Sequence, residues 1–271
     1  MTRTTNISTN SKSDQLIEQI LIKLFKHVSY YYKQCITVVR GCSFLMIACY
    51  AHFHEFALML IEHNMVFDDF VNVCGFNELM VACIYNMPHI AITIIKRGLT
   101  KFDSVDENGN TALLYACINK HDDVALALIQ TGSSNPCRVN DKCNTALIKA
   151  CYSEMKTVAL ALIDISTPIL NYVNKNGNTA LICACNPSME SVALKLIQTN
   201  TIYINHTNNQ KRTALTYACM NGMQDVAIAI LSEDQTCSDK IDVNNKTPKQ
   251  YAQERGIQHV FEYEYDGLLF K

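Results

Sequence analysis

One hydrophobic pattern recurs along most of the chain at a constant interval of 34 residues. The segment TALLYAC begins at Thr111, and close copies of it begin at Thr145, Thr179 and Thr213. The same register extends upstream, where Ala-Cys pairs recur without the leading threonine. A second apolar block, rich in Val, Leu and Ile, follows each of these segments. A fixed period of this length indicates a solenoid, in which each repeat packs only against its neighbours.

Each repeat predicts two short helices. Leu113, Ala116 and Cys117 are three and four residues apart, so they share one helix face, and that face must be buried. The first helix therefore presents small residues that let neighbouring helices approach closely, while the second helix supplies bulk through residues such as Val124 and Leu128. A residue whose side chain can cap free helix N–H groups precedes every first helix. These residues are Ser43, Asn77, Thr111, Thr145, Thr179, Thr213 and Thr247.

The periodicity also divides the chain into regions. We expect a disordered polar N-terminus over residues 1–13, an irregular helical cap over 14–42, six repeats over 43–246 and a C-terminal capping half-repeat over 247–271. The terminal units of a solenoid need a polar outer face, because an exposed apolar face would associate with other molecules. Glutamates in the last unit stand where inner units have apolar residues, as a cap requires.

The motif GNTALLYA that begins at Gly109, followed by Val124 and the Leu128-Ile129 pair, resembles the ankyrin repeat. The resemblance extends over roughly residues 43–265. It implies an all-α solenoid of stacked helix-turn-helix repeats with β-turn fingers. It also implies that the concave face of the array binds a partner protein.

The sequence departs from the usual ankyrin pattern at the turns between repeats. Asn-Gly pairs in two of the turns predict tight geometry, because both residue types tolerate positive φ. The turn glycine is lost at Cys143, Lys211 and Asn245, which leaves the finger conformation there open. The NGNTALI segment that begins at Asn176 is similar to ankyrin arrays encoded by giant DNA viruses of amoebae. That similarity implies a viral protein in the host cytoplasm.

Composition narrows the classes of partner. The 271 residues are 49% apolar and 18% charged, which excludes intrinsic disorder for most of the chain. Lys and Arg number 23 against 25 Asp and Glu, so no basic excess is present to bind nucleic acid.

The longest apolar run, residues 42–51, is too short to cross a membrane, and we expect neither a signal peptide nor a membrane partner. Thirteen is an odd number of cysteines, and most of them fall on apolar helix faces, which indicates a reducing compartment such as the cytoplasm.

The cysteines that recur once per repeat could suggest redox or metal chemistry. Equivalent positions in stacked helices lie about 8 to 10 Å apart, whereas a disulfide needs Cα atoms within about 4.4 to 6.8 Å. We therefore predict small core residues. Cys49, His52 and His54 form a compact group but lack a fourth metal ligand. Phosphate-binding loops and nucleophile motifs are absent from the sequence, so we expect no enzyme activity, no metal and no cofactor.

The helix face opposite the buried stripe supplies the candidate site. Its residues vary in polarity from repeat to repeat, and aromatic residues with a polar tip are common in binding hot spots. The candidate partner-binding residues of this concave stripe are Tyr50, Ile84, Tyr85, Tyr115, Ile118, Lys149, Tyr152, Tyr217 and Met220. The candidate turn tips are Glu107, Asn108, Lys142, Lys175, Asn209 and Lys211. Alternatively, some of these aromatic side chains only fill gaps between adjacent first helices.

These observations favour a non-enzymatic, monomeric scaffold that binds a protein partner on its concave face, which would be a host factor if the chain is viral. An alternative is a substrate adaptor that recruits ubiquitin-ligase machinery through the N-terminal helices, residues 14–39. The sequence does not identify the partner, because repeat scaffolds fix shape and leave specificity to individual side chains.

Overall fold

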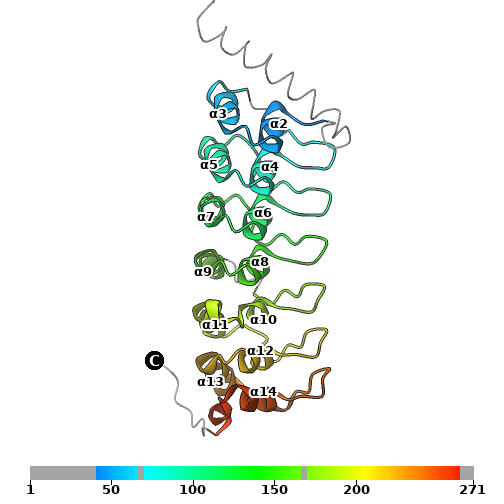
Figure 1. The fold of residues 1–271 in the computed structure, drawn as a ribbon, viewed down its shortest axis with the longest axis vertical. Helices are drawn as coiled ribbons and strands as arrows, with labels where there is room; N and C mark the ends of the chain where they lie inside the picture. The colour runs from blue at the N-terminus through cyan, green and yellow to red at the C-terminus, as the bar shows by residue number, and fades with distance from the viewer. Residues whose placement is uncertain (1–40, 66–69, 166–169, 263–271) are drawn as a thin grey trace, which may run out of the picture.

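The computed structural model describes residues 41–65, 70–165 and 170–262. These residues form a single stack of helix pairs (Figure 1). The first helices of the pairs are α2 (Phe44–Tyr50), α4 (Glu78–Ile84), α6 (Ala112–Ile118), α8 (Ala146–Tyr152), α10 (Ala180–Ala184), α12 (Ala214–Met220) and α14 (Pro248–Arg255). The second helices are α3 (His54–Glu62), α5 (Pro88–Arg97), α7 (Asp122–Gln130), α9 (Lys156–Ile165), α11 (Glu190–Ile197) and α13 (Gln224–Glu233).

Three short 3-10 helices complete the described elements. They are η2 (Pro187–Met189), η3 (Gln235–Asp239) and η4 (Gln258–Phe261). The helical solenoid predicted from the sequence is confirmed, and the described residues contain no β-strand. The predicted N-terminal regions, 1–13 and nearly all of 14–42, lie outside the described residues, as does the end of the capping half-repeat.

Side-chain caps determine where the first helices begin. In the central repeat, Thr145 has an extended backbone, and its hydroxyl accepts a hydrogen bond from the Ile148 N–H at 3.1 Å. The same contact, from the cap residue to the N–H three residues later, occurs at all seven predicted caps. Such a cap stabilises a helix by about 1 kcal/mol. Seven-residue helices, too short to persist alone, therefore start at the same point in each repeat.

The helix α10 is an exception to the regular repeat. It ends at Ala184, two residues earlier in the repeat than α8, and η2 follows it. The Asn186 side chain accepts a hydrogen bond from the Ser188 N–H at 3.1 Å, and Pro187 occupies the first position of the new turn. A proline disfavours the helical conformation of the residue before it, so the sequence Asn-Pro ends the helix here.

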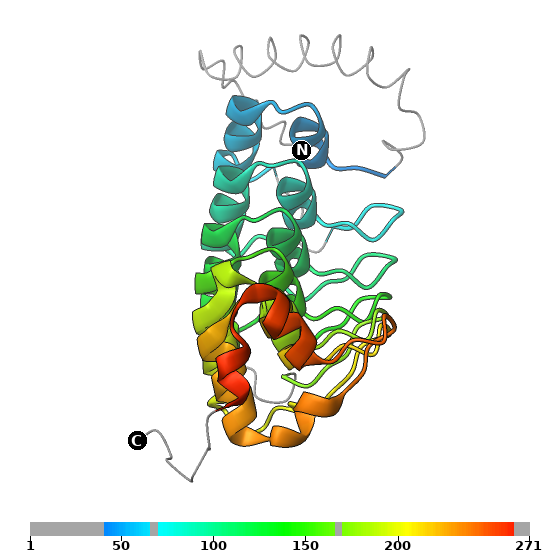
Figure 2. The same ribbon diagram turned by 60° about the horizontal axis from the view of Figure 1, so that its bottom comes forward.

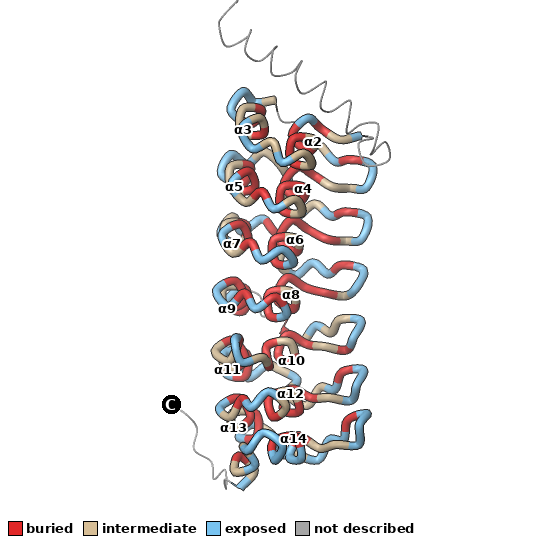
Figure 3. The backbone as a smooth tube through the Cα atoms, viewed as in Figure 1, coloured by how far each residue is buried: buried red, intermediate tan, exposed pale blue. Residues whose placement is uncertain are grey.

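The core lies between the two columns of helices (Figure 3). The alanine and cysteine of the six first helices from α2 to α12 face inward, and the six cysteines at this position are at most 2% exposed; they are Cys49, Cys83, Cys117, Cys151, Cys185 and Cys219. Each of these six helices contacts the second helix of its own repeat and the first helix of the next repeat. The predicted burial of the alanine and cysteine stripe is therefore confirmed.

Each repeat also carries a five-residue turn, called a finger here, and the fingers project from the first helices on the side away from the second helices (Figures 1 and 2). The fingers begin at Asn72, Asp106, Asn140, Asn174, Asn208 and Asp242. In each finger the N–H of the first residue donates to the carbonyl of the fifth. The side-chain Oδ1 of the first residue accepts from the N–H groups two and four residues later.

Neighbouring fingers are joined by one backbone hydrogen bond each. The Asp141 N–H donates to the Asn108 carbonyl at 2.9 Å, and the Lys175 N–H donates to the Lys142 carbonyl at 3.1 Å. Side-chain amides add a second link, as where the Asn140 Nδ2 donates to the Asn110 Oδ1 at 2.8 Å. The described fingers therefore form a continuous hydrogen-bonded ladder along one edge of the stack.

Candidate protein-binding surface

The finger tips and the outward stripe of the first helices lie next to each other. The Tyr217 hydroxyl, on α12, donates to the Gln210 Oε1 at the tip of the same repeat's finger, at 3.1 Å. We call the surface that combines the two predicted sets the finger face. Its helix residues are Tyr50, Ile84, Tyr85, Tyr115, Ile118, Lys149, Tyr152, Tyr217 and Met220, and its tip residues are Glu107, Asn108, Lys142, Lys175, Asn209 and Lys211.

Exposure differs between the two parts of the finger face. All six tip residues are exposed. Among the nine helix residues, Tyr152 is 72% exposed and Ile118 is 40% exposed, while the other seven are half-buried. The finger face therefore offers a partner a polar row of tips beside a row of partly accessible apolar and aromatic side chains.

Two of the predicted tyrosines contact each other. The rings of Tyr50 on α2 and Tyr85 on α4 meet edge to face, with centroids 4.7 Å apart and an interplanar angle of 88°. Burial raises the pKa of the Tyr50 hydroxyl, so this group stays protonated at neutral pH. The pair fills the space between adjacent first helices and leaves part of each ring accessible.

Two other predicted tyrosines use their hydroxyl groups inside the repeat. The Tyr115 hydroxyl donates to the Asp106 Oδ2 at 2.5 Å, and the Tyr217 hydroxyl also accepts from the Asn208 Nδ2 at 3.1 Å. Tyr251, which the sequence analysis did not single out, has the same position in its repeat, and its hydroxyl donates to the Asp242 Oδ2 at 2.8 Å. These hydroxyl groups connect the first helix to the finger of the same repeat. A partner protein would therefore contact the aromatic rings rather than the hydroxyl groups.

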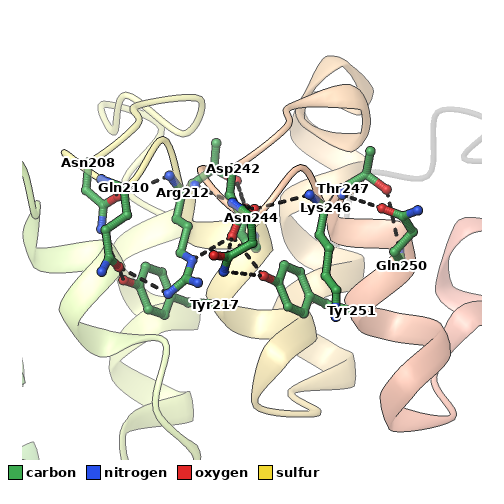
Figure 4. A network of polar contacts seen from close by, with 12 residues as sticks. Asn208, Gln210, Arg212, Tyr217, Asp242, Asn244, Lys246, Thr247, Gln250 and Tyr251 are labelled. Atoms are coloured by element: carbon green, nitrogen blue, oxygen red, sulfur yellow. Dashed lines mark hydrogen bonds and ion pairs between the residues drawn. The ribbon is translucent and has the colours of Figure 1, made fainter.

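The C-terminal fingers are held by a polar network (Figure 4). The Arg212 Nε lies 2.8 Å from the Asp242 Oδ2, and the Asp242 side chain is fully buried. Burial raises the pKa of this carboxyl group, but hydrogen bonds from Arg212, Tyr251 and the N–H groups of Lys246 and Asn244 outweigh burial and lower the pKa to about 2. Asp242 is therefore ionised throughout the physiological range.

Lys149 and Tyr152 lie one turn apart on α8. The Lys149 ammonium is 5.5 Å from the centroid of the Tyr152 ring, a cation–π distance. Burial, and then the nearby ammonium of Lys142, lowers the pKa of Lys149. Lys142 and Lys149 thus place two positive charges close together on the finger face.

The fingers also expose a row of β-branched side chains that the sequence analysis missed. These residues directly precede the first residue of their fingers: Val71 is 49% exposed, Val105 37%, Val139 38% and Ile241 55%. The sequence contained a signal that could have identified this row, because β-branched residues recur at multiples of 34 residues beside an otherwise polar turn.

The recurring cysteines have a structural role. Burial raises the pKa of the Cys49 thiol to about 12, and the nearby Glu78 carboxylate adds to this rise. Burial also raises the pKa of Cys117, and of Cys219, to about 12. Because the thiolate is the reactive form, these thiols are poor nucleophiles at neutral pH. Within the described ranges no group of three His, Cys, Asp or Glu side chains could hold a metal ion, and no helix could span a membrane.

Comparison with known proteins agrees with this architecture. Residues 45–142 and 79–171 match the family model for ankyrin repeats (3 copies). No curated protein shows a significant match to the sequence. The ankyrin repeat domain of Bcl-3, a member of the IkappaB protein family, is similar in structure, with a TM-score of 0.60, 21% identity, and coverage of 83% of this chain and 100% of that chain.

Two further solved structures are similar. The human ASB11 ankyrin repeat domain has a TM-score of 0.60 and 17% identity over 84% of this chain and 100% of that chain. A chain from the complex of the predatory endopeptidase Bd0816 of Bdellovibrio bacteriovorus with its immunity protein Bd3460 has a TM-score of 0.56 and 22% identity over 72% of this chain and 100% of that chain. The comparisons indicate no catalytic family. Residues 45–171 therefore match ankyrin repeats, and the chain folds as an ankyrin-repeat solenoid.

Proposed function

We propose that this protein is a non-enzymatic scaffold that binds a partner protein through the finger face. Ankyrin repeats generally mediate protein–protein interaction. The observation that carries the proposal is the continuity of the finger face, where exposed tips adjoin half-buried aromatic rings over successive repeats. At about 8 to 10 Å per repeat, six repeats extend over about 50 to 60 Å, enough for the roughly 800 Å² per partner of a standard interface.

The most exposed aromatic residue of the finger face provides the test. Purified wild-type protein, Tyr152→Ala and Tyr203→Ala would each be immobilised at equal density, and proteins captured from the native cell extract would be quantified by mass spectrometry. Tyr203 is a matched control, because it is 68% exposed but lies outside the finger face. We expect Tyr152→Ala to lose the captured partner about tenfold or more, while Tyr203→Ala retains it.

Two results would contradict the proposal: equal losses for both variants, or unchanged capture by Tyr152→Ala. Thermal unfolding of each variant would confirm that the fold is retained, since neither ring is buried.

The cellular setting is part of the same proposal. If the similarity to viral arrays reflects origin, the partner is a host protein and the scaffold acts in the host cytoplasm as a monomer. Light scattering should then give a mass close to 30.5 kDa for the purified chain. A mass of twice this value would show self-association and would leave less of the surface for a partner.

A further inference from the structure

The charge of the finger tips changes sign along the stack. The finger that begins at Asp106 carries that carboxylate and Glu107. The next three fingers each carry an exposed lysine, and these are Lys142, Lys175 and Lys211. Within those three fingers the only exposed carboxylate is Asp141, next to Lys142 in the chain.

These three lysines are on directly adjacent fingers. The Lys175 N–H donates to the Lys142 carbonyl at 3.1 Å. The Asn209 side chain, in the finger of Lys211, donates to the Lys175 carbonyl at 2.9 Å. Lys149 adds a fourth positive charge from α8, the helix that follows the finger of Lys142, and its ammonium lies 5.5 Å from the centroid of the Tyr152 ring. We call Lys142, Lys149, Lys175 and Lys211 the lysine strip.

Some of the other described basic side chains have acidic partners. Arg212 pairs with Asp242 at 2.8 Å, and Lys246 pairs with Glu254 at 2.5 Å. None of the four ammonium groups of the lysine strip forms an ion pair with a described residue. Glu154, an exposed glutamate just after α8, accepts a hydrogen bond from the Asn186 side chain at 2.8 Å.

We infer that the lysine strip is the docking site for an acidic segment of the partner protein, whose carboxylates face the four ammonium groups while an apolar side chain packs on the exposed ring of Tyr152. This inference rests on the proposed function and specifies the chemistry of its partner. Complementary charge at an exposed surface mainly sets specificity and the rate of association.

The charges on the neighbouring finger disfavour a nucleic acid as the ligand of this surface. On the N-terminal side, the row of positive charges ends at the exposed carboxylate of Glu107, which would repel a polyanion that continued along the stack. The exposed aromatic and aliphatic side chains beside the strip, Tyr152 and Ile118, fit a protein segment that combines carboxylates with apolar groups.

The spacing of the fingers defines the matching sequence. Adjacent repeats are about 8 to 10 Å apart, and a segment in the polyproline II conformation advances about 3.1 Å per residue with three residues per turn. Because every third side chain of such a segment points the same way, it would place one carboxylate opposite each lysine if every third residue is acidic. The exposed Glu107 carboxylate, on the finger before the strip, limits the acidic residues of the segment to the fingers of Lys142, Lys175 and Lys211.

A synthetic peptide probes this site directly. The probe is a fluorescein-labelled peptide of about 12 residues, with Glu at every third position, one Leu, and Ser and Gly elsewhere; a second peptide has Gln in place of each Glu. Binding to the full-length protein would be followed by fluorescence anisotropy at low and at physiological salt. We expect the Glu peptide to bind, the Gln peptide to bind about tenfold more weakly or not at all, and salt to weaken binding.

The strip variant combines Lys142→Gln, Lys175→Gln and Lys211→Gln. All three side chains are exposed, so the fold should be retained, and we expect the affinity for the Glu peptide to fall about tenfold.

The control variant combines Lys96→Gln, Lys156→Gln and Lys249→Gln, which removes the same charge from exposed positions outside the finger face. We expect its affinity for the Glu peptide to change less than about twofold.

Four results would overturn the inference: no binding of the Glu peptide, equal binding of the Gln peptide, equal losses for the strip and control variants, or tighter binding of an oligothymidylate of the same charge. The proposed function can survive this failure. If Tyr152→Ala loses the captured partner while the strip variant keeps it, the finger face binds a protein but not through an acidic segment.

Discussion

The fourth residue of every described finger has a left-handed backbone, whether or not it is glycine. Glycine fills this position in three fingers, with φ of +77° at Gly75, +73° at Gly109 and +77° at Gly177. The other three positions hold Cys143, Lys211 and Asn245, with φ between +56° and +58°. The turns that the sequence left open therefore keep the finger conformation. The hydrogen bonds of the first residue's side chain hold them there at a strain of about 1 kcal/mol or more per residue.

Substitutions of Gly177 and Lys211, which share this position of the finger, should affect the free energy of unfolding differently. A Cβ atom on Gly177 would lie 2.7 Å from the backbone nitrogen of Asn209, in the next finger. We expect Gly177→Ala to lower the free energy of unfolding by about 1 to 3 kcal/mol, because the left-handed strain and this overlap add. We expect Lys211→Gly to change it by less than about 1 kcal/mol, since relief of strain offsets the greater freedom of the unfolded chain.

Urea denaturation of both variants checks this pair of predictions. A Gly177→Ala protein as stable as the wild type would mean that the fingers can shift apart, contrary to the close packing described.

The Asp242 carboxylate predicts a pH dependence. Its pKa is about 2 in the fold against 3.8 for an unperturbed group, so the folded state binds its proton less readily than the unfolded state. The resulting stabilisation, about 2 kcal/mol, is fully present above about pH 5 and is lost as the pH falls toward 2. Asp242→Asn should remove this stabilisation at neutral pH and flatten the decrease in stability between about pH 5 and 2.

Denaturant unfolding at a series of pH values would measure this effect. The matched control is Asp225→Asn, because Asp225 is an exposed acid on α13 that forms no ion pair with a described residue, so its replacement should change the stability much less. Parallel pH curves for wild type and Asp242→Asn would contradict the prediction.

At the scale of the helix, the side chains buried between repeats stabilise the stack, and the exposed ones contribute little. Leu162 of α9 is fully buried between neighbouring repeats, whereas Tyr152 of α8 projects into solvent. We expect Leu162→Ala to cost about 2 to 5 kcal/mol and Tyr152→Ala to cost less than about 0.5 kcal/mol. Calorimetric or denaturant unfolding checks both values, and a large loss for Tyr152→Ala would show that its ring supports the fold.

The sequence predicted the helices well because their determinants are local. A cap residue, a spacing of three and four residues and a small-residue stripe suffice to place α6 or α8. The early end of α10 also follows from a local signal, the Asn186-Pro187 pair, but the regular repeat made this departure easy to miss.

The candidate site was harder to predict, because its residues depend on contacts between elements. Tyr115 and Tyr152 look alike in the sequence, yet one hydroxyl bonds to a finger carboxylate and the other ring is exposed. The two residues have different positions in the repeat: Tyr152 corresponds to Ile118, three residues after Tyr115 along the first helix, and only the position of Tyr115 brings the hydroxyl to the finger. The lysine strip depends in the same way on the alignment of adjacent fingers.

At the scale of the whole molecule, the stack protects its thiols. The six recurring cysteines are buried along the full length of the array, whereas Cys74 and Cys137 are exposed. We expect a thiol-alkylating reagent to modify Cys74 and Cys137 in the native protein and to modify the recurring cysteines only as repeats unfold. Peptide mass spectrometry over time would measure each site. Rapid modification of Cys151, at the centre, would contradict a cooperative stack.

The junctions between repeats have a consequence for how such a chain can change length. Residues 144–145 and 178–179 are both Asn-Thr, and each precedes a capped first helix with a hydrogen-bonded finger behind it. Excising residues 145–178 would recreate the same dipeptide at the new joint and bring equivalent surfaces together. Gain or loss of one whole unit is therefore a small step for a gene that encodes this protein, and it alters how far the molecule reaches without requiring a new fold.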